Sequence, residues 1–446
     1  MGSRPFSPKF SFMIFMIGVG LVSSSCVTSL MIQPAINGLV VAEKFEYAVK
    51  QLENNPESYG PQNRLLYLLD YGFVLHLAGY YDQSIAVLER AKKEYDQLFT
   101  LSLTKEGFTW LMNDNVAPYR GEDFERVMIN IVQAMNFVVL GNVEGALVEA
   151  RNVDHALKLI NDQYSSEQKN VYREDAFARL LMAILYESGG TQADFNDAFI
   201  SYQKALGIYQ KDYQANYGVG VPQILKENIL AMSGWMGTQE QNNYKNIFPD
   251  VAYSSLQEKE QKAEVYLLHY HGLSPIKHQT SIPIPLPNGK FVKLAFPRYD
   301  KRIYDQKPGT FKAQQTSGET ISCSTELVEN VEAIAYQNLE NRKLRVMAKA
   351  VLRSGGKYLT EWAMEENIRQ GGHEEAADWF KYLSNLYNIT SEQADLRSWQ
   401  TLPAEVRLGR LILEPGTYQL YFNDKELAQV ELQRGEKKFF LVRTNQ

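Results

Sequence analysis

Apolar residues recur at three- and four-residue spacing along the stretch from residue 118 to residue 157. The carboxylates of Glu122, Asp123 and Glu125 precede this pattern, and acidic groups suit the exposed N–H groups of a helix start. Gly141-Asn142 interrupts the pattern, and residues 146–159 then repeat it. The stretch therefore predicts two amphipathic helices that form a hairpin. One face of the first helix is apolar through Val127, Ile131, Ala134, Met135 and Val138.

A similar spacing of small and large apolar residues occurs around residues 68–91 and, more loosely, around residues 183–205. Gly72 and Ser84 are small enough to let two antiparallel helices approach, and Gly79 supplies a turn between them. This arrangement is typical of a tetratricopeptide (TPR) repeat. The usual Trp and the closing Pro are missing, so a generic helical bundle is the alternative. We predict a TPR-like helical repeat domain over residues 61–248.

The hydrophobic period changes to that of β-strands after Glu264. Residues 265–270 are rich in strand formers, residues 282–287 form an extended proline segment, and Asn288-Gly289 is a hairpin signal. Helical patterns return over 325–352 and 358–368, and four strands over 406–413, 417–422, 426–432 and 437–443 are separated by short turns. The predicted fold class is α+β. An N-terminal TPR-like α-helical array precedes a C-terminal α+β domain (249–446) with an antiparallel β-sandwich or meander and a helical insertion.

The N-terminus has the pattern of a bacterial lipoprotein signal peptide. Arg4 and Lys9 are followed by an apolar run over residues 10–22, and three serines precede Cys26. We predict a signal peptide over residues 1–25, lipidation of Cys26, and an anchor segment with a first helix over residues 26–60. Leu21 lies five residues before the cysteine, where a lipobox has it three before, so an ordinary cleaved signal peptide is the alternative.

Charge and cysteine content narrow the possible partners. The formal charge of the chain is −6; without Arg4 and Lys9, 44 basic residues face 52 acidic ones, which gives −8. No long basic run exists, so nucleic acid is not an expected partner. The chain has two cysteines, and lipidation of Cys26 leaves Cys323 without an intramolecular disulfide partner.

The start of the predicted hairpin carries one group of candidate site residues. They could bind a ligand at the helix N-terminus, or they could form an ion-pair lock between repeats, since Glu122 and Arg126 have i,i+4 spacing. Glu149 and Arg151 on the second helix could complete such a network. We favour the structural lock over the ligand site. The group comprises Tyr119, Arg120, Glu122, Glu125, Arg126, Glu149 and Arg151.

A second group is expected to line the concave surface of the array and to contact a partner protein. Trp110 lies in the loop 101–119, which could close over one end of that surface. Tyr67 and Tyr71 could instead pack against the helix predicted over residues 42–53. The candidate partner-binding residues are Tyr67, Tyr71, Trp110, Asn130 and Asn136.

Candidates for metal binding and catalysis are weak. His269 and His271 would point to the same face of a predicted exposed strand, and His278 could be a third zinc ligand. Pairs of histidines on exposed strand faces are common, however. The acidic pairs Glu365-Glu366 and Glu374-Glu375 lie near Trp362 and Trp379, and a glycosidase needs two facing carboxylates. Polar helix faces explain these pairs equally well. No phosphate loop, nucleophile elbow or zinc-protease motif is present, so we predict no enzyme activity, no cofactor and no metal.

Three short motifs resemble those of a known family. They are Tyr119-Arg120-Gly121-Glu122 with Glu125-Arg126, the run from Ala146 to Arg151, and the run from Ala394 to Trp399 before Leu402-Pro403. The chain resembles a family of uncharacterised bacterial outer-membrane lipoproteins with TPR-like repeats. Its members are often encoded beside small lipoproteins similar to the curli secretion pore. The resemblance implies a role in envelope assembly or secretion, and it carries over no catalytic residue.

The sequence therefore predicts a non-enzymatic lipoprotein, anchored in the outer membrane of a Gram-negative bacterium and facing the periplasm. Its TPR-like array would bind a partner protein, expected to be another envelope lipoprotein. Two alternatives remain open: a periplasmic carbohydrate- or peptide-binding protein, favoured by an aromatic-lined pocket, and a cell-wall enzyme or its regulator, favoured by two carboxylates converging in a cleft.

Overall fold

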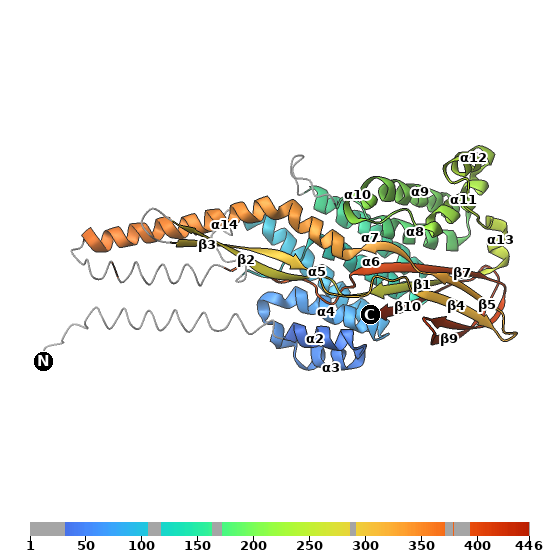
Figure 1. The fold of residues 1–446 in the computed structure, drawn as a ribbon, viewed down its shortest axis with the longest axis horizontal. Helices are drawn as coiled ribbons and strands as arrows, with labels where there is room; N and C mark the ends of the chain where they lie inside the picture. The colour runs from blue at the N-terminus through green and yellow to red at the C-terminus, as the bar shows by residue number, and fades with distance from the viewer. Residues whose placement is uncertain are drawn as a thin grey trace.

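The computed structural model describes residues 32–105, 117–162, 172–285, 291–370, 378 and 393–445. The predicted signal peptide, Cys26, Trp110, Glu374-Glu375 and Trp379 lie outside these residues. The described chain begins with helices and continues with strands and one long helix (Figure 1). The predicted α+β class, with an N-terminal helical array and C-terminal strands, is confirmed.

Three consecutive helical hairpins make up the array. The turn of the second hairpin places Gly141 at φ 74°, a left-handed conformation that favours glycine. Its first helix starts at a capping box, in which Glu122 and Glu125 satisfy each other's backbone N–H groups. The hairpins are α4 (Arg64–Leu77) with α5 (Tyr81–Lys105), α6 (Asp123–Val139) with α7 (Val143–Asp162), and α8 (Ala176–Gly189) with α9 (Gln192–Ile208).

Shorter helices flank these hairpins. The segment expected to lead away from the membrane contains a helix, α2 (Ile32–Val41), which precedes α3 (Phe45–Asn54). Two 3₁₀ turns precede α4, and they end at Tyr59 and at Asn63. After α9 come a π-helical turn (Tyr209–Tyr213), α10 (Gln214–Tyr217), α11 (Gln223–Met236), α12 (Thr238–Ile247) and α13 (Leu256–Gln261).

Two four-stranded sheets follow. The central sheet has the order β10-β1-β7-β6 and the outer sheet the order β5-β4-β8-β9. The last four strands therefore do not form one meander: β8 and β9 join the outer sheet, and β10 returns to pair in parallel with β1. The strands are β1 (Ala263–His271), β4 (Thr310–Gln315), β5 (Thr320–Ser324), β6 (Glu326–Asn330), β7 (Glu405–Leu413), β8 (Gly416–Phe422), β9 (Lys425–Leu432) and β10 (Lys437–Thr444).

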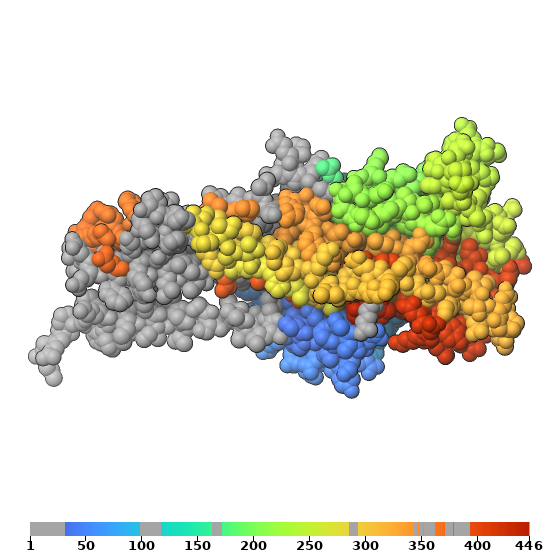
Figure 2. Space-filling view, viewed as in Figure 1, coloured from blue at the N-terminus to red at the C-terminus, as the bar shows by residue number. Residues whose placement is uncertain are grey.

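A two-stranded hairpin and a long helix extend from the body. The hairpin pairs β2 (Ile276–Pro285) with β3 (Phe291–Asp300), and β3 contacts the helix α14 (Val331–Gln370). The 40 residues of α14 give a helix about 60 Å long. Residues 326–330, predicted as helix, form β6 instead. In Figure 2 the hairpin (yellow) lies along the described part of α14 (orange).

The central sheet is buried on both faces. Val265 and Leu267 of β1 face the outer sheet, whereas Tyr266, Leu268 and Tyr270 belong to the core shared with the helices. The molecule therefore has three layers: helices, central sheet and outer sheet. The hydrophobic core runs without interruption across residue 249, the predicted domain boundary. The first described helices also contact the last strands, since Glu43 pairs with Lys425, and Figure 2 shows the blue helices beside the red strands.

The first helix of each hairpin faces the central sheet. Phe73 of α4 packs against Tyr270 of β1, with ring centroids 5.7 Å apart, while α6 contacts β10 and α8 contacts β6. The chain's own sheet therefore fills the inner face of the array, which the sequence predicted to be open to a partner.

Candidate functional site

Asn136 is not a partner-binding residue, because it is completely buried between α4, α5 and α6. Its amide nitrogen donates to the Ser84 hydroxyl at 2.9 Å, and its amide oxygen lies 2.6 Å from Nδ1 of His76. Burial lowers the pKa of His76 to about 4, so the imidazole is neutral and able to donate to the amide oxygen. Asn136 therefore joins the helices of two neighbouring hairpins.

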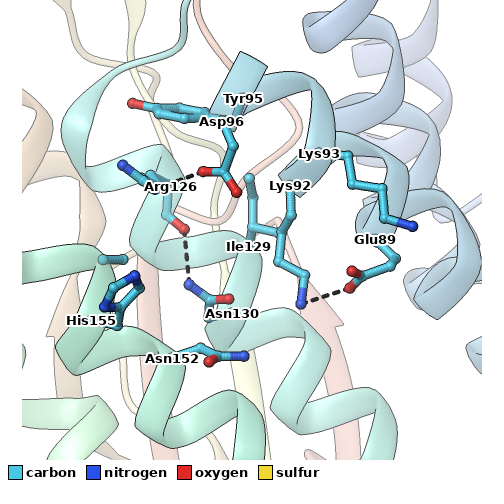
Figure 3. A pocket seen from close by; sticks show the side chains of 11 residues that line it. Glu89, Lys92, Lys93, Tyr95, Asp96, Arg126, Ile129, Asn130, Asn152 and His155 are labelled. Atoms are coloured by element: carbon cyan, nitrogen blue, oxygen red, sulfur yellow. Dashed lines mark hydrogen bonds and ion pairs between the residues drawn. The ribbon is translucent and has the colours of Figure 1, made fainter. Parts of the chain in front are cut away.

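A polar pocket opens on the outer side of the array, between α5, α6 and α7 (Figure 3). Its volume is about 200 Å³, which suits a side chain or a small polar molecule. We call it the polar pocket. Its lining residues are Glu89, Lys92, Lys93, Tyr95, Asp96, Arg126, Ile129, Asn130, Asn152, His155 and Ala156.

Two cations in the walls of the polar pocket, Arg126 and Lys92, are held by acids. Arg126 pairs with Asp96 at 2.7 Å, and its guanidinium lies 5.0 Å from the ring centre of Tyr95. Lys92 pairs with Glu149 at 2.8 Å and with Glu89 at 2.7 Å. The acids of Asp96 and Glu89 are more exposed than the cations they pair with. The pocket therefore has fixed cations in its walls and acids at its rim.

Asn130 lies at the base of the polar pocket and is 4% exposed. Its amide nitrogen donates to the main-chain oxygen of Arg126 at 3.4 Å. Its amide oxygen is buried and has no hydrogen-bond partner. A buried acceptor without a donor is uncommon in folded proteins, and here it borders a cavity. Asn130 therefore lines a cavity on the outer side of the array, not the concave surface predicted for it.

The predicted ion-pair lock has different members from those expected. Glu122 pairs with Lys277 at the start of β2 and with Arg342 of α14, and a Glu122–Arg126 pair is not among the ion pairs of the described residues. Residues outside the array are therefore the partners of Glu122. The i,i+4 prediction was wrong because the N-cap residue points toward the hairpin and α14 rather than along its own helix.

The other predicted members of this lock are dispersed. Glu149 pairs with Lys92 in the wall of the polar pocket. Arg151 donates to the hydroxyl of Tyr186 at 2.8 Å, which links α7 to α8. Arg120 is exposed. Glu149 and Arg151 therefore stabilise two different helix contacts and do not complete a network with Glu122.

Tyr119 and Glu125 form a buried junction with the segment before β7. The carboxylate of Glu125 accepts from the Tyr119 hydroxyl at 2.6 Å and from the main-chain N–H of Trp399 at 2.7 Å. Burial raises the pKa of Glu125 to about 7, although these two hydrogen bonds lower it. Nearby, Arg397 forms a salt bridge of 2.7 Å with Asp395. The segment from Asp395 to Trp399 therefore docks on the array, through Arg397 to Asn63 and through Trp399 to Glu125.

His269 and His271 are buried, not exposed as predicted. Nε2 of His269 and Nδ1 of His271 lie 2.7 and 2.6 Å from the hydroxyl oxygen of Thr444, and Nε2 of His271 contacts the main-chain oxygen of Asp305. His278 is exposed on β2, 3.9 Å from Asp300. Among the described residues, no group of three His, Cys, Asp or Glu side chains is placed to hold a metal ion. The prediction of an exposed strand face failed because the outer sheet covers β1.

The remaining sequence candidates lie apart from one another. Tyr71 donates to Glu53 of α3 at 2.9 Å and stacks on Tyr67, which agrees with the packing alternative for these two residues. Glu365 of α14 pairs with Arg369 at 3.2 Å. Cys323 lies in β5, and burial raises the pKa of its thiol to about 11, which disfavours the nucleophilic thiolate.

A second cavity lies between β3 and α14. Its volume is about 380 Å³, and most of its lining is apolar. The aromatic side chains of Phe296, Tyr299 and Tyr336 contribute to this lining. Its residues are Thr280, Phe296, Pro297, Arg298, Tyr299, Tyr336, Leu339 and Glu340.

Sequence reasoning missed most of the polar pocket. Glu89, Lys92 and Asp96 are spaced i, i+3 and i+7 along α5, so they share one helix face. That spacing is visible in the sequence, but charged residues on one face also describe an ordinary solvated helix. This face becomes the wall of a cavity only because α6 packs against α5 and α7 packs against α6.

Comparison with protein-family models gives no match, and comparison with curated proteins gives none either. Within the part of the chain that the structure describes, no helix combines the length and the apolar character needed to cross a membrane.

Proposed function

We propose that this protein is a non-enzymatic lipoprotein of the cell envelope that binds a partner protein through the outer side of its helical array. Lipid on Cys26 would hold it at the outer membrane, facing the periplasm. The partner is proposed to be another envelope protein in assembly or secretion. The central contact would be the polar pocket between α5, α6 and α7.

The observation that supports this proposal is the position of the polar pocket. The central sheet fills the inner face of the array, so the outer side is the part of the hairpins left for a partner. There the buried oxygen of Asn130 lacks a hydrogen-bond donor, beside a cavity of about 200 Å³. An interface side chain that entered this cavity would supply a donor and would be fully desolvated, as the central residues of protein interfaces are.

Site-specific photo-crosslinking in the native host tests the proposal. A photoreactive amino acid replaces Lys93, which is exposed at the rim of the polar pocket, or Lys245, which is exposed on α12. We expect one defined protein adduct at position 93 and none of the same mass at position 245. Mass spectrometry then identifies the partner and the segment that is joined.

Charge reversal provides the matched control. The Lys93→Glu protein, used as bait on wild-type membranes, should recover less of the partner that crosslinking identified. The Lys245→Glu protein should recover as much of it as the wild-type bait does. Equal adducts at both positions, or no adduct at position 93, would contradict a partner site at the polar pocket.

The second cavity favours an alternative function, the binding of a carbohydrate or peptide. Phe296, Tyr299 and Tyr336 give it the aromatic lining that such ligands use. Calorimetric titration with an N-acetylated disaccharide and with short apolar peptides tests this alternative. A saturable signal that Tyr336→Ala abolishes would support it, and titrations without heat would remove it.

A further inference from the structure

We propose that the polar pocket selects an uncharged primary amide, the side chain of a glutamine or asparagine that the partner protein presents. This proposal rests on the partner-binding function proposed above and names the chemical group that is recognised. Three properties of the polar pocket carry it: its paired charges, the orientation of Asn130, and the covered ring of Tyr95.

The paired charges disfavour a charged ligand group. The side chains of Arg126 and Lys92 are only 10% and 19% exposed, and both already contact carboxylates. An incoming carboxylate would compete with Asp96 and Glu89 for Arg126 and Lys92 or would reach only Lys93 at the exposed rim, and an incoming ammonium would meet Lys92 and Arg126. Removing one member of a largely buried ion pair is unfavourable. An uncharged group leaves all these pairs intact.

The amide of Asn130 can have only one orientation. A main-chain carbonyl accepts hydrogen bonds and cannot donate them, so the nitrogen of Asn130 must face the oxygen of Arg126. The amide oxygen is then the atom left without a partner. Figure 3 shows the Asn130 side chain between Arg126 and Lys92. The ligand must therefore bring an N–H or O–H donor to this oxygen.

The position of Tyr95 argues against a sugar ring. Sugars bind proteins by stacking on an open aromatic face, but the guanidinium of Arg126 already lies over the Tyr95 ring at 5.0 Å. Tyr95 is only 6% exposed. The rest of the apolar lining is aliphatic, from Ile129 and Ala156. A flat side-chain end suits this lining better than a ring that needs an aromatic platform.

A primary amide satisfies all three properties. Its NH₂ group can donate to the buried oxygen of Asn130, and its carbonyl can accept from a donor in the pocket wall, without a charge of its own that would disturb the ion pairs. A carboxylate of the same size lacks the donor that Asn130 requires, so glutamate is a matched negative control for glutamine.

The test uses the full chain in detergent micelles with ¹³C-labelled isoleucine methyl groups. Ile129 lines the polar pocket, and Ile129→Val identifies its signal. The probes are the N-acetyl N-methylamides of glutamine and of glutamate, and N-acetylglucosamine. We expect the glutamine probe to shift the Ile129 signal saturably, with an affinity about tenfold above the other two, the factor that one buried hydrogen bond supplies. Asn130→Ala should remove this preference.

Equal or tighter binding of the glutamate probe or of the sugar would overturn the amide assignment, as would the absence of a saturable shift with all three. The probe series in the wild-type protein decides the question even if Asn130→Ala does not fold. Crosslinking separates the two proposals. If an adduct forms at position 93 but the joined segment contains no Asn or Gln, only the amide assignment is overturned. If no adduct forms there, partner binding itself is overturned.

Discussion

The main-chain N–H of Trp399 donates a hydrogen bond of 2.7 Å to the carboxylate of Glu125, 274 residues earlier in the chain. The same carboxylate accepts from the main-chain N–H of Glu122 at 3.0 Å. The capping box that starts α6 therefore also holds the segment leading into β7. Local helix formation and the docking of the central sheet depend on one side chain, so the array and the sheet should unfold together.

Glu125 should make stability depend on pH. Its pKa is about 7 in the folded protein, against 4.5 for an ordinary Glu. The folded state therefore holds the extra proton between pH 4.5 and 7, and its stability falls as pH rises across this range. Wild type should lose about 2 kcal/mol more than Glu125→Gln between pH 5 and pH 8. Urea unfolding at both pH values measures this, and parallel losses would count against the assignment.

Glu264 should be among the most sensitive positions in the molecule. It is 2% exposed and pairs with Lys259, Arg410 and Lys437. Although burial opposes ionisation, these three cations hold the pKa of Glu264 well below its usual range. Glu264→Ala leaves three buried cations with only Glu187 and Glu227 as acidic partners and should cost about 3–5 kcal/mol.

An exposed ion pair is the control for Glu264. Lys425 contacts Glu43 at 3.3 Å, with side chains 76% and 43% exposed. Lys425→Ala should change stability by less than about 0.5 kcal/mol. Thermal unfolding followed by circular dichroism compares the two variants. Similar losses in both would show that burial of the Glu264 network does not set its contribution.

Two glycine substitutions should shift stability in opposite directions. A Cβ at Gly72 would lie 2.5 Å from Cδ2 of Leu88, where α4 and α5 meet. Gly72→Ala should therefore cost about 1–3 kcal/mol through overpacking. A Cβ at Gly207, near the end of α9, meets no atom within 4 Å, so Gly207→Ala should stabilise by about 0.5–1 kcal/mol. Melting temperatures that moved in the same direction would contradict this packing.

Cys26 should determine where the protein is found. Acyl chains contribute about 0.8 kcal/mol per buried CH₂ group, so several chains give stable anchoring. Cys26→Ser, expressed in the native host, should move the protein from the outer-membrane fraction to the soluble periplasm. Fractionation and immunoblotting test this, and unchanged membrane association would exclude Cys26 as the anchor.

Elements with local signals could be predicted from the sequence. The hairpin of α6 and α7 follows from apolar periodicity, acidic residues at its start and Gly141 at its turn. Pro222 predicts the start of α11, which begins at Gln223. The run of strand formers over residues 265–270 predicts β1. These signals act over a few residues because backbone hydrogen bonds and caps are satisfied within the element itself.

Partners across the fold could not be predicted in this way. The apolar stripe of α6 shows that one face is buried, but not that the chain's own sheet buries it. Asn136 is polar, so its pattern suggested exposure, and only His76 and Ser84 from the neighbouring hairpin make its burial favourable. The sequence by itself determined the elements that carry strong local signals, such as α6, α7 and α11, through periodicity and capping, but not β6, which was predicted as helix. The tertiary structure decided which faces stay open, because burial depends on elements hundreds of residues apart.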